Sequence, residues 1–335
     1  MISYTIRRLL LILPTAFAAL SLLFGLFFLL PGDPATLIVG GANRNVPEEV
    51  IERAKVRYGL DESVPEQFVN YWKRTLRWDL GESFQNDRSV NEILGERAPN
   101  SIRLSFWAIL IEIAVGLSVG IISAIRRYSV VDRVTTVITA VASAIPVFVL
   151  GFVLQYALAV YPNKHDWPEW AKLRVQGRGP DTWTLFFIPT GETWRYLVLP
   201  AITLASVSTA LAARMMRGSM LEVSGSDFMR TAKAKGLSER SIVLRHGLRN
   251  AMLPVITLIG LDFATTIGTA VLTETVFNWN GIGSTIARAV GERDAPVMLA
   301  LTLVVVIAYA VINLIVDLSY AFFDPRVRLD SGGHG

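Results

Sequence analysis

Six long apolar runs constrain what this 335-residue chain can fold into more than any other feature of its sequence. Each run is close to the roughly 20 mostly apolar residues that an α-helix needs to cross a bilayer, and four of the six contain no charged residue. Only 18% of all residues are charged, and the mean hydropathy of +0.44 is unlike that of a soluble domain. The sequence therefore predicts an all-α membrane protein with six transmembrane helices, at residues 9–30, 104–125, 135–161, 196–213, 250–273 and 295–316.

The residues of most catalytic centres are missing from the sequence. There is no cysteine, and the three histidines are scattered, which excludes thiolate chemistry and leaves no histidine cluster for a metal. The HExxH, GxSxG and P-loop patterns are absent. Glu48, Glu49 and Arg53 spell EExxxR, which some intramembrane proteases use, but they fall in a polar segment outside the apolar runs. We therefore expect no catalytic residue, cofactor or metal site, and any nucleotide hydrolysis must come from a partner.

The placement of Lys and Arg predicts the orientation of the chain. Six spans put the segments 1–8, 126–133, 214–249 and 324–335 on one side, and these hold about half of the 32 basic residues in about a fifth of the length. The positive-inside rule then places both termini in the cytoplasm. Because topology and lipid headgroups explain the basic pI, nucleic acid is not an expected partner. The expected layout is an N-terminus with the first span (1–30), an extracytoplasmic helical segment (31–99), a core of five spans (100–323) that includes a cytoplasmic loop (214–250), and a cytoplasmic tail (324–335).

The two outer segments differ in what their sequences reveal. A helix is predicted from Pro47, with Glu48 and Glu49 at its positive end, to Gly59. A second helical pattern then repeats apolar residues at every fourth position, namely Phe68, Trp72, Leu76 and Leu80. One explanation is that this stripe packs on the outer mouth of the bundle or lies at the membrane interface. The other is that it docks an external partner. The other outer segment, 162–193, carries Trp167, Trp170 and Trp183 and matches no pattern.

The loop between the fourth and fifth spans is predicted to hold a helix pair. Ser226 can cap a helix over Asp227–Lys235, and Gly236 can end it in the left-handed conformation. Leu237 can then fold back on the helix, and Ser238 can cap a second one. Such a unit, with Phe228 and Met229 beside Ala232, suits insertion into a groove of a soluble partner. A basic helix resting on anionic lipid is the alternative.

This loop resembles the EAA loop of ABC-importer permeases, particularly in the dipeptide/oligopeptide/nickel importer family. The family sequence is close to DYxRTARAKGLxxxxVxxxHxLRNAxLP, and this chain supplies Asp227, Arg230, Thr231, Ala232, Ala234, Lys235, Gly236, Leu237, His246, Leu248, Arg249, Asn250, Ala251 and Pro254. Further matching motifs are IRRLLLILPT near the N-terminus, LLPGDPA at 29–35, DLGES at 79–83, RMMRGSMLEV at 214–223, LTETVFNWNGIG at 272–283 and NLIVDLSYAFFDPRVR at 313–328. The resemblance covers essentially the whole chain and points to the B-type permease subunit.

This chain departs from the family pattern at several positions. The broad EAA signature has Glu-Ala-Ala where this chain has Arg230, Thr231 and Ala232. It then has an isoleucine and a Leu-Pro where this chain has His246 and Leu248 followed by Arg249, and the peptide branch tolerates these changes. Asn280 stands where that branch often has proline in a W-P-G motif.

The resemblance implies a permease of the bacterial cytoplasmic membrane that works with a second, C-type permease, two ATPase subunits and an external substrate-binding protein. ATP and Mg²⁺ would be bound by the ATPases. The residues implied in coupling to an ATPase are Asp227, Phe228, Arg230, Thr231, Ala232, Lys235, Gly236 and Leu237. The residues expected to hold the shape of the loop are His246, Arg249 and Asn250.

Acidic residues in the apolar runs are the remaining candidates, because a charge in the bilayer usually faces protein or water. Asp262 is expected to line the substrate path, to pair with an arginine of the partner permease, or to make an interhelical hydrogen bond. Glu112 is expected to pair structurally, and Glu274 to act in gating or in contact with the binding protein. Gly116 and Gly120 form a GxxxG pattern that predicts close helix packing.

Two classes of transporter remain open from the sequence. An ion-coupled secondary transporter or channel would explain six spans and buried acids, but it has no need for the capped helix pair. An importer permease explains both. Peptides fit the family best as substrates, although nickel complexes, glutathione and short sugars use similar permeases.

Overall fold

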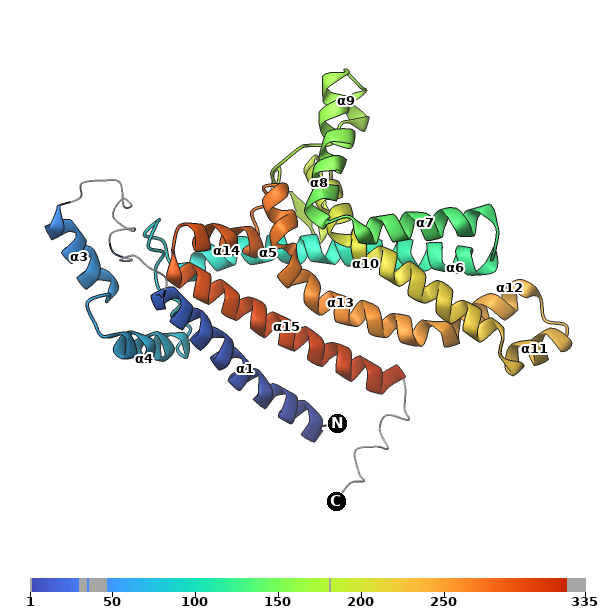
Figure 1. Cartoon of the computed structure of the whole chain (residues 1–335), viewed down its shortest axis with the longest axis horizontal. Helices are drawn as coiled ribbons and strands as arrows, with labels where there is room; N and C mark the ends of the chain where they lie inside the picture. The colour runs from blue at the N-terminus through green and yellow to red at the C-terminus, as the bar shows by residue number, and fades with distance from the viewer. Residues whose placement is uncertain (1, 30–34, 36–46, 181, 324–335) are drawn as a thin grey trace. The chain divides into compact units, whose positions relative to one another are not determined.

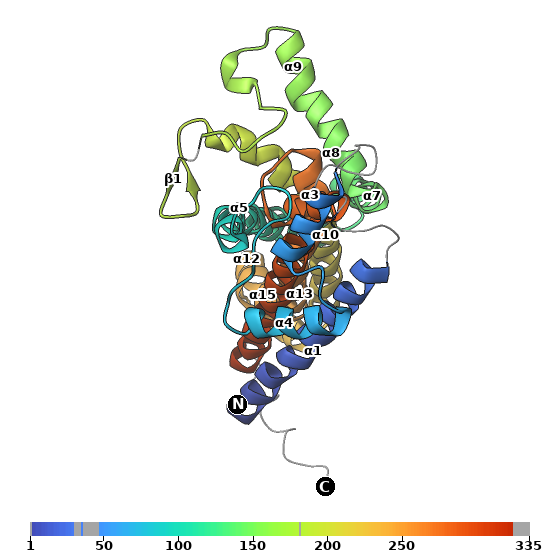
Figure 2. The ribbon, with the colours of Figure 1, turned by 90° about the vertical axis from the view of Figure 1, so that its left-hand side faces the viewer.

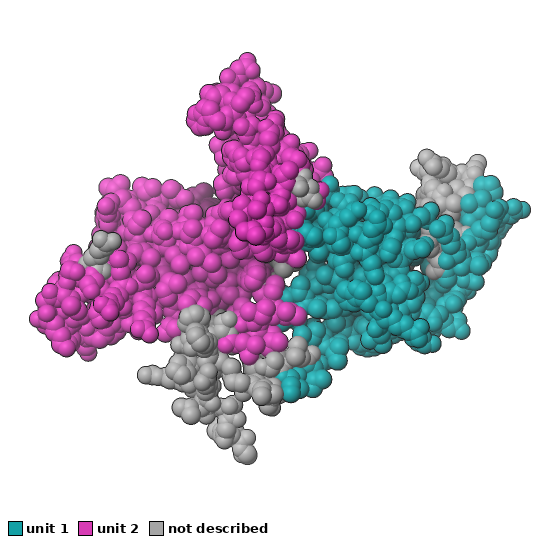
Figure 3. Space-filling view, turned by 180° about the vertical axis from the view of Figure 1, so that it is seen from behind, with its two compact units in different colours: residues 1–101, 280–310 teal, residues 102–279, 311–335 magenta. Residues whose placement is uncertain are grey.

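The computed structural model describes residues 2–29, 35, 47–180 and 182–323. The chain divides into two compact units, residues 1–101 with 280–310 and residues 102–279 with 311–335, which Figure 3 colours separately. The predicted tail 324–335, and residues 36–46 of the predicted outer segment, lie outside the described residues.

The described residues are mainly helical, as expected, and Figure 1 labels their elements. The α-helices are α1 (Ile2–Leu29), α3 (Glu48–Tyr58), α4 (Val64–Thr75), α5 (Val90–Ile111), α6 (Leu117–Ile125), α7 (Val130–Ala144), α8 (Val147–Gln155), α9 (Tyr161–Lys164), α10 (Thr193–Ser224), α11 (Asp227–Ala234), α12 (Glu239–Ser241), α13 (Leu248–Val276), α14 (Ile282–Gly291) and α15 (Ala295–Phe323). The π-helical segments are η1 (Glu112–Gly116), η2 (Tyr156–Val160) and η4 (Ile242–Gly247), and η3 (Glu169–Ala171) is a 3₁₀ turn. Strands β1 (Trp183–Thr184) and β2 (Ile188–Pro189) pair antiparallel, with Trp183 opposite Pro189 and Thr184 opposite Ile188.

Five helical segments in the described part of the chain are long and apolar enough to cross a membrane. They are Val90–Ile125, Val147–Lys164, Thr193–Ser224, Ile242–Phe263 and Ala295–Val316. Each overlaps one of the last five predicted spans. Helix α1 is apolar over the shorter stretch Leu10–Leu26, so a sixth span remains a prediction.

The third predicted span, 135–161, is not one continuous helix. The structure breaks it at Ile145, which is extended with φ −82° and ψ 128°, so that α7 ends at Ala144 and α8 begins at Val147. The cause is Pro146, because the proline ring disfavours the helical conformation of the residue before it. The stretch that can cross a membrane here is therefore Val147–Lys164.

The first unit has an aromatic core between α1 and α4. Phe68 and Trp72 of α4 pack against α1, with ring centroids 5.3 Å apart for Phe24 and Phe68 and 5.0 Å apart for Phe17 and Trp72. Burial raises the pKa of Tyr71, in the same cluster, to about 12. Of the two explanations for the aromatic stripe, internal packing therefore accounts for Phe68 and Trp72.

The predicted stripe is wrong beyond Trp72. Helix α4 ends at Thr75, so Leu76 caps it and is exposed, while Leu80 joins a different cluster with Val90. The boundaries of α3 were predicted more closely. Pro47 precedes the helix as its N-cap, and Gly59 ends it with φ +65°.

The second unit is built around α10, which packs against α6, α7, α8 and α13 (Figure 1). The closest approach lies at the predicted GxxxG pattern. A Cβ atom on Gly120 would lie 2.6 Å from both the Ala213 carbonyl oxygen and Met216 Cβ, and one on Gly116 would lie 3.0 Å from Ala212 Cβ. The prediction of close packing is confirmed, because only glycine fits at this distance.

Replacing Gly120 with valine is expected to lower the stability of the chain by about 1–3 kcal/mol, the usual effect of overpacking. The methyl groups would have to separate α6 from α10. The midpoint of thermal unfolding of the purified chain in detergent measures the effect. Gly218→Val is the control, because a Cβ there would meet nothing within 4 Å. Equal losses from the two substitutions would contradict the packing explanation.

The outer segment 162–193, which matched no sequence pattern, folds onto the second unit. Gln155 Nε2 donates hydrogen bonds to the Val175 carbonyl (2.8 Å) and the Val276 carbonyl (3.1 Å), and the Gly177 N–H donates to the Phe277 carbonyl (2.8 Å). The β1–β2 hairpin belongs to this segment and stands beside α5 in Figure 2.

Candidate functional site

The loop between α10 and α13 forms the predicted short helix outside the candidate spans. Helix α11 follows α10 after Gly225 and Ser226, and it ends one residue earlier than expected, at Ala234. Ser226 is extended at the N-cap, but its hydroxyl donates to the Val223 carbonyl (2.6 Å) and does not cap the helix. The helix is therefore fixed more firmly at its end than at its start.

Gly236 ends α11 in the way the sequence predicted. It has φ +75°, and its N–H donates to the Lys233 carbonyl (3.0 Å) while the Leu237 N–H donates to the Ala232 carbonyl (3.4 Å). This pair of bonds is a Schellman motif, which requires the left-handed residue at its centre. Ser238 then caps the next helix, since its hydroxyl accepts from the Ser241 N–H (3.4 Å).

Helix α11 has one buried and one exposed face. Met229 and Ala232 are buried against Ile242, so these two residues hold the helix on the loop and do not face a partner. This corrects the expectation that Met229 and Ala232 flank Phe228 on an inserting surface. The other residues implied in coupling are exposed, namely Asp227, Phe228, Arg230, Thr231, Lys235, Gly236 and Leu237.

The second helix of the loop is continuous with a membrane helix. Helix α12, the second helix that Ser238 was predicted to cap, leads through η4 directly into α13. Of the residues expected to support the loop, Asn250 donates from Nδ2 to the His246 carbonyl (2.8 Å), one turn earlier in the same helical run, and both Arg249 and Asn250 are exposed, so their support of the loop stays a prediction. A movement of α11 would therefore reach α13 through the short turn 235–238 alone.

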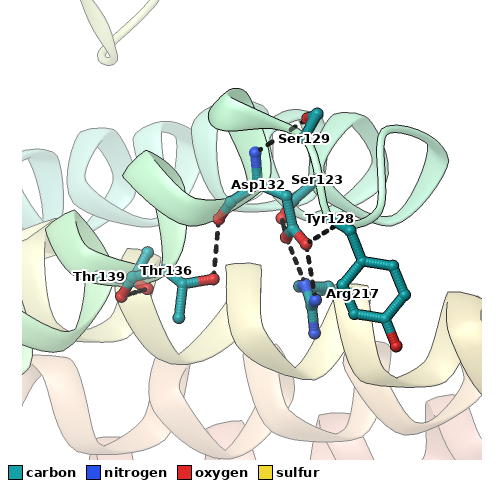
Figure 4. A network of polar contacts seen from close by, with 7 residues as sticks. All are labelled: Ser123, Tyr128, Ser129, Asp132, Thr136, Thr139 and Arg217. Atoms are coloured by element: carbon teal, nitrogen blue, oxygen red, sulfur yellow. Dashed lines mark hydrogen bonds and ion pairs between the residues drawn. The ribbon is translucent and has the colours of Figure 1, made fainter.

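A buried ion pair, which the sequence did not reveal, joins three helices near the end of α10 that precedes α11 (Figure 4). Arg217 of α10 donates from Nε to Asp132 Oδ1 (2.7 Å) and from a terminal nitrogen to Oδ2 (2.8 Å). Asp132, in α7, also accepts from the Ser123 hydroxyl of α6 and from the Tyr128 N–H (2.9 Å). Its side chain is only 4% exposed.

This network fixes the turn between α6 and α7 to α10. The hydrogen bonds from Arg217, then from Ser123 and Tyr128, hold the pKa of the Asp132 carboxyl well below its usual range. Arg214, one turn away, donates to the Ser143 hydroxyl (2.9 Å). The sequence offered one signal for this site, since Asp132 is the only acid in the basic segment 126–133.

The acidic residues of the spans take two different positions. The side chains of Glu112 in η1 and Asp262 in α13 lie close enough to interact electrostatically, and Asp262 also lies near Ser208 of α10. Among the described residues, Glu112 Oε1 and Asp262 Oδ2 have no hydrogen-bond partner. The expected structural pairing of Glu112 and the interhelical contact of Asp262 are thus one feature. No group of three or more metal-binding side chains occurs in the described part of the chain.

Glu274 is fully buried near the end of α13. The backbone N–H of Trp279, a residue that is also fully buried, donates to the Glu274 carbonyl (2.7 Å). In this conformation Glu274 cannot touch an external binding protein, which corrects that part of its expected role. A role in gating remains a prediction.

Comparison with known proteins identifies the family. Residues 116–329 match the family described as binding-protein-dependent transport system inner membrane component, and residues 1–105 match its N-terminal domain. The chain is 37% identical over 330 residues to a probable peptide ABC transporter permease protein of Sinorhizobium fredii, with 97% of this chain and 99% of the relative covered. It is 35% identical over 330 residues to a glutathione transport system permease protein of Escherichia coli, with 98% and 99% covered. The chain therefore belongs to the inner-membrane components of binding-protein-dependent transport systems and is a transport permease, not an enzyme.

Proposed function

We propose that this chain is one permease subunit of an ATP-driven importer for peptides. The substrate class follows the names of the relatives, one a probable peptide permease and the other a glutathione permease, and glutathione is itself a short peptide. The chain would form half of the translocation path. A second, C-type permease would form the other half, and an external binding protein would deliver the substrate.

Helix α11 is proposed to seat in a cleft of a cytoplasmic ATPase subunit. The observation that carries this proposal is the arrangement of the helix, with a buried face on the loop, an exposed face outward, and only the short turn 235–238 between it and the continuous helical run of α12, η4 and α13. Asp227, Phe228, Arg230, Thr231, Lys235 and Leu237 provide the contacting surface. Ala232 and Gly236 set the shape of the helix and its end, and His246, Arg249 and Asn250 support the loop. Closure of the ATPases around ATP would then move α13 with α11.

Two acidic residues are proposed to act along the path. Asp262 is only partly buried, and its contact with Glu112 joins α13 to η1. A change in the spacing of these helices would either expose the carboxyl groups of Asp262 and Glu112 to the path or bury them. Glu274 is proposed to belong to the outer gate, because the end of α13 around it is tightly packed.

The proposed topology has six spans, including α1, with both termini in the cytoplasm of a bacterium. The layout is that expected from the sequence, with residues 31–99 outside, a core over 100–323 and a tail at 324–335. The density of basic residues in the inner segments supports this orientation.

Single cysteines at Ser63 and Ser238 are expected to react with a membrane-impermeant thiol reagent from opposite sides of the membrane. Both residues are exposed, and the native chain has no cysteine to interfere. Intact cells should label S63C only, and inside-out vesicles S238C only. The cysteine-free chain is the blank. Labelling of both positions from the same side would contradict the topology.

The function itself is tested by reconstitution. The chain and the proteins that co-purify with it are placed in liposomes, with ATP either inside or outside. Uptake of labelled dipeptides and of labelled glutathione is then measured with the binding protein present. The proposal expects uptake that needs ATP. The carboxyl pair favours one competing function, an ion-coupled carrier, and uptake by the chain alone down an ion gradient would establish that function instead.

A further inference from the structure

The β1–β2 hairpin carries large apolar residues at its tip in a strained backbone. Leu185 has φ +49° and Phe186 has φ +66°, and the Phe187 N–H donates to the Leu185 carbonyl (2.8 Å). Non-glycine residues rarely adopt positive φ, and a three-residue turn of this kind is rare and strained. Such strain persists only where the surrounding structure enforces it, and it is concentrated at functional positions.

Helix α5 enforces this conformation. Arg103 Nε donates to the Phe186 carbonyl (2.9 Å), and Trp107 Nε1 donates to the Phe187 carbonyl (2.8 Å). The Arg103 guanidinium carbon also lies 4.6 Å from the centroid of the Trp183 ring and 4.7 Å from that of Phe186. The tip is therefore held rigidly in place.

The fixed tip presents an apolar surface. Leu185 is 81% exposed, Ile188 48% and Phe186 42%. No charged residue occurs from Thr182 to Thr190. An isolated exposed leucine needs no explanation, but a rigid cluster of apolar residues at a turn marks a contact surface.

The apolar tip is continuous with the exposed side of a membrane helix. The Phe187 ring packs against Phe106 of α5 with a centroid distance of 4.4 Å. Phe106 is followed at helical spacing by Leu110 and Ile113, which are also exposed. These residues lie within the candidate span Val90–Ile125, whose exposed apolar side chains contact lipid in a membrane protein.

Arg103 marks the polar boundary of this surface. It precedes the uncharged stretch from Leu104 to Ile111, and its guanidinium lies over the rings of two aromatic residues. Aromatic rings and long basic side chains gather at the headgroup level of a bilayer, where the ring or stem is buried and the polar end meets phosphate. The hairpin also precedes the start of α10, whereas α11 follows its other end, so the two lie on opposite sides of the membrane.

We propose that Leu185 and Phe186 insert into the interfacial region of the outer leaflet, with Arg103 at the level of the lipid phosphates. The hairpin thus anchors the outer segment 162–193 to phospholipid. The choice of leaflet rests on the proposed topology, whereas the insertion itself does not depend on the substrate or on coupling to ATP.

A spin label on Leu185→Cys tests the anchor. The full chain, with its co-purifying subunits, is reconstituted in liposomes of phosphatidylethanolamine and phosphatidylglycerol. Power-saturation electron paramagnetic resonance then compares collisions with oxygen, which concentrates in the bilayer, and with the water-soluble nickel(II) ethylenediaminediacetate complex. We expect oxygen accessibility several times that of the nickel complex. A label on Glu169→Cys, on η3 of the same segment, is the aqueous control and should show the reverse.

Two outcomes would overturn the anchor. Greater access to the nickel complex at position 185 would place the tip in water. Low access to both reagents would place it against protein, either the second permease or the binding protein. Ile188→Cys provides a second labelled site if the first variant fails to assemble, and it is expected to give the same order of accessibilities. Loss of transport in the proposed function would leave these accessibilities unchanged, so the two failures are distinguishable.

Discussion

Gly236→Val is expected to abolish ATP-driven uptake while leaving the chain inserted in the membrane. Gly236 has φ +75° and supplies the left-handed residue of the motif that ends α11. An L-residue in this conformation costs about 1–2 kcal/mol, and a β-branched residue resists it further. No atom lies within 4 Å of a Cβ at this position, so the effect acts through the backbone alone. Uptake into liposomes and ATP hydrolysis by the reconstituted complex measure it.

The control for this prediction is Gly236→Asn. Asparagine adopts the left-handed conformation more readily than other side chains, so this variant should keep most of the uptake. ATP hydrolysis by the valine variant should continue without matching transport, because the ATPase sites themselves are untouched. Normal uptake by Gly236→Val would show that the end of α11 has no part in coupling.

Reversing the charge of Asp132 is expected to have the second largest effect. Asp132→Arg would place two guanidinium groups together in a site where the carboxylate is 4% exposed. We expect the midpoint of thermal unfolding to fall by roughly 5 °C or more, because a broken buried ion pair belongs to the small class of strongly destabilising changes. The exchanged pair, Asp132→Arg with Arg217→Asp, should recover part of the loss. Thermal unfolding of the purified chain is the measurement.

Two comparisons make this prediction specific. The exposed pair Arg74 and Asp79 (2.9 Å) is the matched control, and reversing Asp79 should change the midpoint little. The stabilisation by Asp132 also depends on pH. Because the pKa of its carboxyl is lowered in the folded state, the stabilisation is complete above the ordinary aspartate pKa of about 3.9 and is lost as the pH falls below it. A difference between Asp132→Asn and the native chain that stays constant down to pH 3 would contradict this assignment.

Local signals in the sequence predicted the turn and the second cap of the loop between α10 and α13. Gly236 and Ser238 act through their own backbone and hydroxyl groups, so their roles can be recognised without knowledge of the fold. The same holds for the glycines of the GxxxG pattern, although the sequence could not say which helix they meet. One wrong prediction also has a local cause. Pro146 breaks the helix within the predicted span 135–161, which hydropathy alone had treated as continuous.

Long-range pairs were beyond sequence reasoning. Asp132 and Arg217 are far apart in the chain, and nothing in the sequence indicates that they meet. The fold brings them together as an ion pair. Asp262 was singled out by its position in an apolar run, but its proximity to Glu112, which is distant in the chain, depends on the fold. The exposed side of α11 could be assigned only after Ile242 was known to cover Met229 and Ala232.

The unbroken helical path from α12 through η4 into α13 would act as a lever arm in the proposed importer. At about 1.5 Å per residue, the run from Glu239 to Val276 is about 55 Å long. A tilt of about 5° at the α12 end would shift the far end by about 5 Å, close to the rise of one helical turn. Small displacements inside an ATPase dimer would thus be amplified geometrically at the opposite face of the membrane, with no large rearrangement at the point of contact.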